Sequence, residues 1–166
     1  MRKADDSENP LLSPGQAGGS TRSALMRRVK QKHTGPEILL RKILHRLGFR
    51  FSLHVAALPG TPDIVMRKHR SVIFVNGCFW HGHDCRRGAL PATRREFWER
   101  KIVVNRARDA RVERQLLDDG WRVLTVWECA ITGKSRLPRA ELETLLTTWL
   151  RHGAESASDA LAGRKT

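Results

Sequence analysis

The sequence contains no long apolar run and no apolar N-terminal segment. Because no stretch of about 18 consecutive apolar residues is present, a membrane-spanning helix is not predicted. The first residues also lack the apolar core of a secretory signal peptide. We therefore expect a cytoplasmic protein.

Cysteine is also scarce. Three cysteines cannot all pair with one another, and two of them, Cys78 and Cys85, lie close to histidines in the chain. Metal ligation therefore explains them better than a disulfide framework does. A reducing compartment fits both observations.

Acidic residues are few relative to basic ones. Only 17 Asp and Glu oppose 31 Lys and Arg, which gives a formal net charge of +14. The basic residues run from Arg2 to Lys165, so the excess is not confined to one tail. Such a charge favours a polyanionic partner, with nucleic acid ahead of an anionic membrane surface.

The length of 166 residues, with 40% of them hydrophobic, suits one domain with one core. Residues 1–20 are polar and rich in helix breakers, and we expect a disordered arm there and a disordered tail at 152–166. The domain is then 21–151. Its first residues are basic, which suits a segment that orders on a phosphate backbone, although a solvated helix face is the alternative. The side chains that we assign to backbone contacts are Arg22, Arg27, Arg28 and Lys30.

The hydrophobic pattern predicts a compact α/β core. Residues 49–55 alternate apolar and polar, so we expect a strand with His54 facing solvent. A long helix should start at Pro91-Ala92-Thr93 with Thr93 as its cap, and Phe97, Val104 and Leu117 should form part of its apolar stripe. The other predicted elements are a helix from Thr34 to Gly48, strands starting at Asp63 and Ser71, a strand from Trp121 to Trp127, and a last helix after Pro138.

Between Gly77 and Cys85 the chain gathers thiols, imidazoles and large aromatic side chains directly after an apolar strand. A set of three cysteines and one histidine suits a closed, tetrahedral zinc site, which would be structural. The predicted ligands are Cys78, His83, Cys85 and Cys129. Buried cysteines without metal are the alternative. His81 competes with His83 as a ligand, and the spacing does not separate them.

Asp63 stands at the start of an apolar strand, where packing alone would favour an uncharged residue. Because Mg²⁺ binds through one or two carboxylates and keeps several waters, Asp63 with Glu37 and Asp109 is a candidate magnesium site. A surface aspartate at a strand edge is the alternative. Phe79 and Trp80 are either core residues or, beside a basic surface, wedges for DNA bases, and Trp98 can join them.

Four separated motifs, in order, resemble the very short patch repair (Vsr) mismatch endonucleases. They are Gly60-Thr61-Pro62-Asp63, residues 72–85 (VIFVNGCFWHGHDC), residues 91–98 (PATRREFW) and residues 120–129 (GWRVLTVWEC). The resemblance covers roughly residues 20–151. It implies a fold similar to that of type II restriction endonucleases, in which helices flank a mixed central sheet, with an added structural zinc site.

The resemblance also implies an activity and partners. The protein would nick DNA 5′ to the thymine of a T:G mismatch that arises by deamination of 5-methylcytosine. It would act as a monomer on double-stranded DNA in the nucleoid, with other mismatch-repair proteins and a repair polymerase as possible later partners.

The resemblance assigns roles to individual residues. Asp63 would bind Mg²⁺, together with the backbone carbonyl of Val75, and His81 would be the general base or orient the attacking water. Glu37 and Asp109 would hold metal-bound waters. The remaining assignments are Cys78, His83, Cys85 and Cys129 to zinc, and Phe79, Trp80 and Trp98 to a wedge beside the mismatch.

Two positions depart from the pattern. No Glu-x-Lys follows on the strand of residues 71–75, and Asn76 stands where some relatives carry a histidine. The first departure shifts proton transfer towards His81. The competing functions are a restriction-type endonuclease that cuts matched duplex and a zinc-stabilised DNA-binding module without catalysis.

Overall fold

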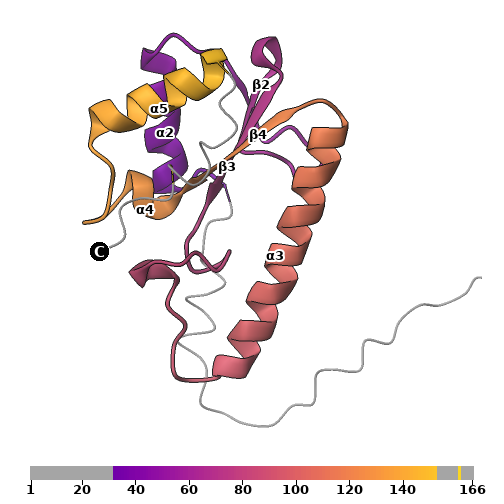
Figure 1. Ribbon diagram of the computed structural model, residues 1–166, viewed down its shortest axis with the longest axis vertical. Coiled ribbons are helices and arrows are strands. Elements are labelled where there is room, and N and C mark those ends of the chain that lie inside the picture. Colours follow the sequence, from indigo (N-terminus) through magenta and orange to yellow (C-terminus); the bar gives the residue numbers. More distant parts are fainter. Residues whose placement is uncertain (1–31, 153–160, 162–166) are drawn as a thin grey trace, which may run out of the picture. The chain divides into compact units, whose positions relative to one another are not determined.

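The computed structural model describes residues 32–152 and Leu161, within a compact unit that spans Lys32–Thr166 (Figure 1). Residues 1–31, 153–160 and 162–166 are not described. The predicted disordered arm, and the predicted phosphate contacts of Arg22, Arg27, Arg28 and Lys30, therefore lie outside the described residues and stay predictions.

A mixed sheet of four strands forms the centre of the unit. The strands are β1 (Ser52–Leu53), β2 (Ile64–Met66), β3 (Ser71–Asn76) and β4 (Arg122–Trp127), in the order β1-β2-β3-β4. Strand β2 pairs antiparallel with both β1 and β3, whereas β3 and β4 are parallel over their whole length. The predicted mixed sheet is therefore confirmed.

Helices flank this sheet. They are α2 (Gly35–Arg46), α3 (Arg95–Asp118), α4 (Glu128–Ile131) and α5 (Arg139–His152), with short 3-10 turns η1 (Arg67–His69) and η2 (Arg86–Gly88). The start of α2 follows the prediction, because Thr34 is its N-cap and Glu37 accepts hydrogen bonds from the Thr34 backbone and hydroxyl. None of the helices in the described part of the chain combines the length and the apolar composition that a membrane-spanning segment needs.

Alternating strand residues divide the core into two layers. Ile73 of β3 belongs to the larger layer, which α2 and α5 cover, and the neighbouring Val72 packs with Leu116 of α3 on the opposite face. Figure 1 shows α2 and α5 on one side of the sheet and α3 on the other. Since α3 also connects the parallel strands β3 and β4, it lies beside the strand ends that carry the candidate site.

The strand predicted over residues 49–55 is mostly absent. Only Ser52 and Leu53 pair with β2, and Phe49 is buried in the larger core layer. His54 follows with a φ of 47°, a left-handed conformation that interrupts strand alternation. Its side chain is 10% exposed, so the prediction of a solvent-facing His54 is wrong.

The long helix α3 also differs from its prediction in its start and in its buried face. It begins at Arg95, after Arg94 in the left-handed conformation, and no side-chain cap bond is present, so the predicted Thr93 cap is wrong. The predicted stripe of Phe97, Val104 and Leu117 is exposed. Ile102 and Leu116 are the buried residues of α3, because this helix packs on the sheet and on the loop after β3 through another face.

Leu161 lies within the segment predicted as a disordered tail, but it packs in the core. Its side chain is fully buried in the larger core layer. Its carbonyl oxygen accepts a hydrogen bond of 3.2 Å from the backbone N–H of Trp127, the last residue of β4. Leu161 therefore contributes to the core at the end of the strand that precedes Cys129.

Candidate functional site

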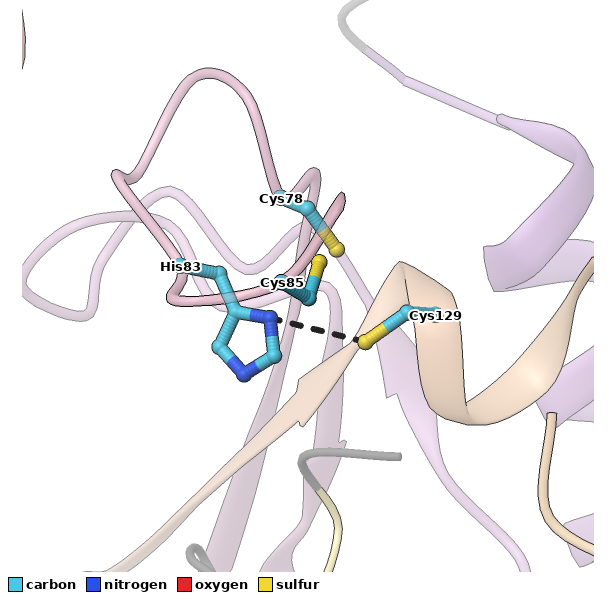
Figure 2. Close-up of side chains that lie close together, drawn as sticks. All are labelled: Cys78, His83, Cys85 and Cys129. Carbon is cyan, nitrogen blue, oxygen red and sulfur yellow. Dashed lines mark hydrogen bonds between the residues drawn. The ribbon is translucent and has the colours of Figure 1, made fainter. Parts of the chain in front are cut away.

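Four sulfur and nitrogen ligands converge where β3 and β4 end. The side chains of Cys78, His83 and Cys85, from the loop after β3, point towards Cys129 of α4 (Figure 2). Their ligand atoms all lie within 4.8 Å of one another, and Cys129 Sγ is 3.5 Å from His83 Nδ1. The structure thus brings together the four predicted zinc ligands and places His83, not His81, among the cysteines.

Two glycines allow the loop to reach this arrangement. Gly82 has a φ of 65°, and a Cβ atom there would lie 2.4 Å from Ile102 Cγ2 of α3. A Cβ on Gly88 would lie 1.9 Å from the carbonyl oxygen of His83. Both positions therefore require glycine, one for packing on α3 and one for folding the loop back on His83.

The donor set fits zinc. Three thiols and one imidazole would complete a tetrahedral zinc site without an open position for substrate. Burial raises the pKa of the Cys78 thiol and that of Cys129, so these thiols stay neutral without metal. A bound zinc ion would deprotonate them and link β3 to β4. The set therefore suits a structural metal site.

Asp63 lies at the start of β2, where the strand meets β3. Its Oδ2 atom accepts a hydrogen bond of 2.8 Å from the backbone N–H of Val75. Burial raises the pKa of Asp63 to about 6, although the Val75 hydrogen bond lowers it. Asp63 is thus a half-buried carboxylate with its other oxygen, Oδ1, facing His54.

Glu37 is buried and accepts hydrogen bonds at both oxygens. Oε1 accepts from the backbone and hydroxyl of Thr34, and Oε2 from the backbone of His33 and the guanidinium of Arg41. A carboxylate offers about four acceptor positions, so all of them are engaged. The prediction that Glu37 holds metal-bound waters stays a prediction.

His54 is the site residue that sequence reasoning missed. Its Nε2 atom lies 3.5 Å from Glu37 Oε2, and its Nδ1 atom lies 3.6 Å from Asp63 Oδ1. Glu37, His54 and Asp63 form the second group of side chains whose ligand atoms lie within 4.8 Å of one another. Burial lowers the pKa of His54, against the charge of Glu37, and favours the neutral imidazole. The alternation of apolar and polar residues over 49–55 predicts that His54 faces solvent, so the sequence pattern could not indicate this contact.

His81 pairs with Asp109 of α3. The distance between His81 Nδ1 and Asp109 Oδ2 is 2.5 Å, and Arg108 also donates to Asp109. Burial raises the pKa of Asp109, but the His81 hydrogen bond and the charges of His81 and Arg108 outweigh this and lower it. The ionised carboxylate orients the imidazole, so that Nδ1 carries a proton and Nε2 is the nitrogen that can accept one.

The three predicted wedge residues lie together. The rings of Phe79, Trp80 and Trp98 meet edge to face, with centroid distances of 5.0 to 6.1 Å. Each of the three side chains is partly exposed. Asn105 of α3 holds the loop in place by donating 2.8 Å to the carbonyl oxygen of Trp80. The cluster thus presents aromatic surface between the loop and the start of α3.

Trp127 contacts both histidines of the loop. Its ring stacks on His83 at a centroid distance of 4.3 Å and meets His81 edge to face at 6.5 Å. Of these two histidines, His83 belongs to the cysteine cluster and His81 to the Asp109 pair. Asn76 lies beside Trp127 as its partner in the β3-β4 register.

The mixed sheet with flanking helices, a carboxylate at the start of β2 and a histidine after β3 define a protein of the restriction-endonuclease-like class. Comparison with known proteins supports this. The family model described as DNA mismatch endonuclease Vsr matches residues 17–87.

Curated relatives extend the match beyond residue 87. The type II nicking enzyme V.XorIIP of Xanthomonas oryzae pv. oryzae is 50% identical over 125 residues, which cover 75% of this chain and 91% of that protein. The DNA mismatch endonuclease Vsr of Escherichia coli K12 is 44% identical over 131 residues, 79% of this chain and 84% of that protein. The type II nicking enzyme V.NmeAIP of Neisseria meningitidis is 41% identical over 116 residues, 70% and 83% of the two chains. The chain belongs to the Vsr family of DNA mismatch endonucleases.

Proposed function

We propose that this protein nicks one strand of duplex DNA on the 5′ side of the thymine in a T:G mismatch. The observation that carries the proposal is that, in a member of this family, Asp63 is bound to Val75 of β3 and the loop after β3 places the His81–Asp109 pair directly after the clustered rings of Phe79 and Trp80. The relatives named mismatch endonuclease and nicking enzyme support single-strand cleavage. The net charge of +14 supports DNA as the partner.

His81 is the proposed general base. Asp109 holds its Nδ1–H, so Nε2 is the nitrogen positioned to take a proton from the attacking water. A general base of this kind contributes a rate factor of about 100 or more. As His81 Nε2 takes the proton, the water oxygen forms a bond to phosphorus and the bond from phosphorus to the leaving sugar oxygen breaks. That oxygen then takes a proton from solvent.

Asp63 and the backbone carbonyl of Val75 are the proposed ligands for Mg²⁺. Asp63 fits because its Oδ2 atom is fixed by the Val75 N–H while a second oxygen remains for the metal. When bound, Mg²⁺ would neutralise developing charge on the phosphate and on the leaving oxygen. Glu37 and Asp109 are the residues proposed to hold metal-bound waters. The Glu37 side chain also accepts a hydrogen bond from Arg41, and Asp109 pairs with His81.

The aromatic cluster is the proposed wedge at the mismatch. Partly exposed rings of Phe79, Trp80 and Trp98 can insert between base steps, at an unstacking cost that is smallest at a mismatched pair. Phe79, Trp80 and His81 belong to the loop that carries three of the four zinc ligands, and Trp98 of α3 packs against Phe79 and Trp80. Bound zinc would hold this loop without taking part in hydrolysis.

The experiment is a nicking assay on matched and T:G duplexes that differ in a single base. The proposal expects Mg²⁺-dependent cleavage of the thymine strand, and Asp63→Ala and His81→Ala should abolish it while remaining folded. Equal cleavage of the matched duplex would favour a restriction-type endonuclease. Binding to the mismatch without cleavage at any Mg²⁺ concentration would favour a non-catalytic module.

A further inference from the structure

A chain of polar contacts through Arg41 and His54 reaches Asp63 from α2. The Arg41 side chain is only 12% exposed. Its NH2 atom donates 2.5 Å to Glu37 Oε2 and lies 2.9 Å from His54 Nε2, and its NH1 atom lies 2.8 Å from His33 Nδ1. The guanidinium is thus held by an acidic and two imidazole partners.

The contact with Arg41 determines which nitrogen of His54 carries the proton. Arginine has donors and no acceptor, so His54 Nε2 must accept from Arg41 through its lone pair. A neutral imidazole with an acceptor at Nε2 carries its proton at Nδ1. His54 Nδ1 is the atom that faces Asp63 Oδ1.

Both oxygens of Asp63 then face donors. The Val75 N–H fixes Oδ2 at 2.8 Å, and His54 Nδ1–H faces Oδ1 at 3.6 Å. A separation of 3.6 Å is longer than a hydrogen bond, so this second contact is a charge–dipole attraction. Hydrogen bonds at active sites are often longer before substrate binds and shorten in the complex.

Arg41 also argues against His54 as a direct metal ligand. Glu37, His54 and Asp63 are close enough to hold an ion together. However, the Arg41 guanidinium occupies Glu37 Oε2 and His54 Nε2, and it repels a cation at the same place. An ion at Asp63 would therefore have His54 beside its ligand and not in its own coordination shell.

We propose that His54, held by Arg41 with its proton on Nδ1, is a positioning residue that fixes the orientation of Asp63 for divalent metal. The inference rests on the proposed function, because it assigns the metal to Asp63. Partners that orient a metal ligand in this way change metal affinity by about 10- to 100-fold.

The first test is independent of activity. In a long-range ¹H–¹⁵N spectrum of histidine-labelled, zinc-loaded protein at pH 8, His54 should show the tautomer with the proton on Nδ1. Arg41→Met should shift it towards the Nε2 tautomer, and Arg46→Met, an exposed arginine of the same helix, should not. A proton on Nε2 in the unaltered protein would overturn the inference.

The second test measures the metal directly. Mn²⁺, titrated by electron paramagnetic resonance into zinc-loaded protein without DNA, should bind His54→Leu about 10- to 100-fold more weakly than the unaltered chain. His54→Gln should bind within a few-fold of it, because an amide supplies both a donor and an acceptor. Both side chains are unbranched at Cβ, so the strain of the positive φ at this position is shared.

Nicking assays separate this inference from the proposed function. In His54→Leu the Mg²⁺ concentration for half-maximal nicking should rise while affinity for the T:G duplex stays unchanged, and excess Mg²⁺ should restore the rate. Equal Mn²⁺ affinity in His54→Leu and the unaltered chain, or equal loss in His54→Gln and His54→Leu, would refute the role of His54. If His54→Leu does not fold, Arg41→Met provides the same comparison.

Mn²⁺ binding that is unchanged in Asp63→Asn would instead contradict the proposed metal site. Absence of nicking by the unaltered chain would contradict the proposed activity. In that case the tautomer and Mn²⁺ titrations would still decide whether His54 positions Asp63.

Discussion

His81 Nδ1 and Asp109 Oδ2 lie 2.5 Å apart and join the loop after β3 to the middle of α3, across 28 residues of sequence. Two further contacts support this junction. Asn105 of α3 donates to the Trp80 carbonyl, and Gly82 packs against Ile102. The orientation of His81 therefore depends on α3 as much as on its own loop.

Asp109→Asn should lower the nicking rate by about 100-fold, since the neutral amide no longer fixes the imidazole or stabilises its protonated form. Single-turnover kinetics on a T:G duplex measure this. The rate should fall without a comparable change in duplex affinity.

The matched control is Asp118→Asn, an exposed aspartate in the last turn of the same helix. This variant should nick at the rate of the unaltered chain. A full rate in Asp109→Asn, or an equal loss in both variants, would contradict the role of the His81–Asp109 pair.

Much of the fold could be predicted because the apolar pattern determines it. The strand of residues 71–75 and the strand of residues 121–127 are mainly apolar and rich in β-branched and aromatic residues, and they form the parallel pair β3 and β4. The start of α3 could not be predicted. Thr93 and Glu96 match a capping box, but Arg94 adopts a left-handed conformation that no side-chain pattern indicates.

The site was predictable only where chemistry is concentrated in sequence. The three thiols and a nearby histidine could be grouped by residue type, yet spacing did not separate His81 from His83. The folded loop does so, because His83 lies among the thiols and His81 pairs with Asp109. His54 could not be found, because its alternating position indicates solvent. A left-handed backbone conformation, determined by tertiary contacts, brings it to Asp63 instead.

Removal of Cys129, a proposed zinc ligand, should destabilise the protein. Cys129→Ala should lose bound zinc and more than about 3 kcal/mol of unfolding free energy, because the metal would no longer link the β3 loop to α4. Mass spectrometry for metal content and denaturant unfolding provide the two measurements. A chelator should destabilise the unaltered chain by a similar amount and change Cys129→Ala little. Equal stability with and without zinc would contradict a structural metal.

Trp98→Ala should weaken binding to the T:G duplex. Stacking of one aromatic ring on a base contributes about 1–3 kcal/mol, so the dissociation constant should rise about 5- to 150-fold. Leu117→Ala, an exposed residue near the other end of α3, should bind normally. Fluorescence anisotropy at fixed salt measures both. Equal affinities in Trp98→Ala and Leu117→Ala would exclude Trp98 from the wedge.

Asp63 predicts a pH dependence of stability in protein without Mg²⁺. Burial raises its pKa from 3.8 to about 6, so the carboxyl binds its proton more tightly in the folded chain. Its stabilising contribution is therefore complete below pH 3.8 and is lost as the pH rises through 6. The side chain of Asp63→Asn does not titrate. As the pH rises from 3.8 through about 6, the unfolding free energy of this variant should therefore increase by up to about 3 kcal/mol relative to that of the unaltered chain.

Denaturant unfolding at pH 4 and pH 7.5 compares the two chains. Mg²⁺ should stabilise the unaltered chain at pH 7.5 and leave Asp63→Asn unchanged, because only the carboxylate binds the ion. A stability difference that does not vary with pH would contradict the burial of Asp63 as the cause of its raised pKa.

The central claim is that this protein cleaves one strand at a T:G mismatch by using Asp63 and His81. The most direct measurement is strand-resolved nicking of a T:G duplex and its matched C:G counterpart by the unaltered chain, Asp63→Ala and His81→Ala. We expect a single Mg²⁺-dependent cut 5′ to the mismatched thymine by the unaltered chain only, with the matched duplex intact. Cleavage of both duplexes at the same rate, or full activity in either variant, would contradict it.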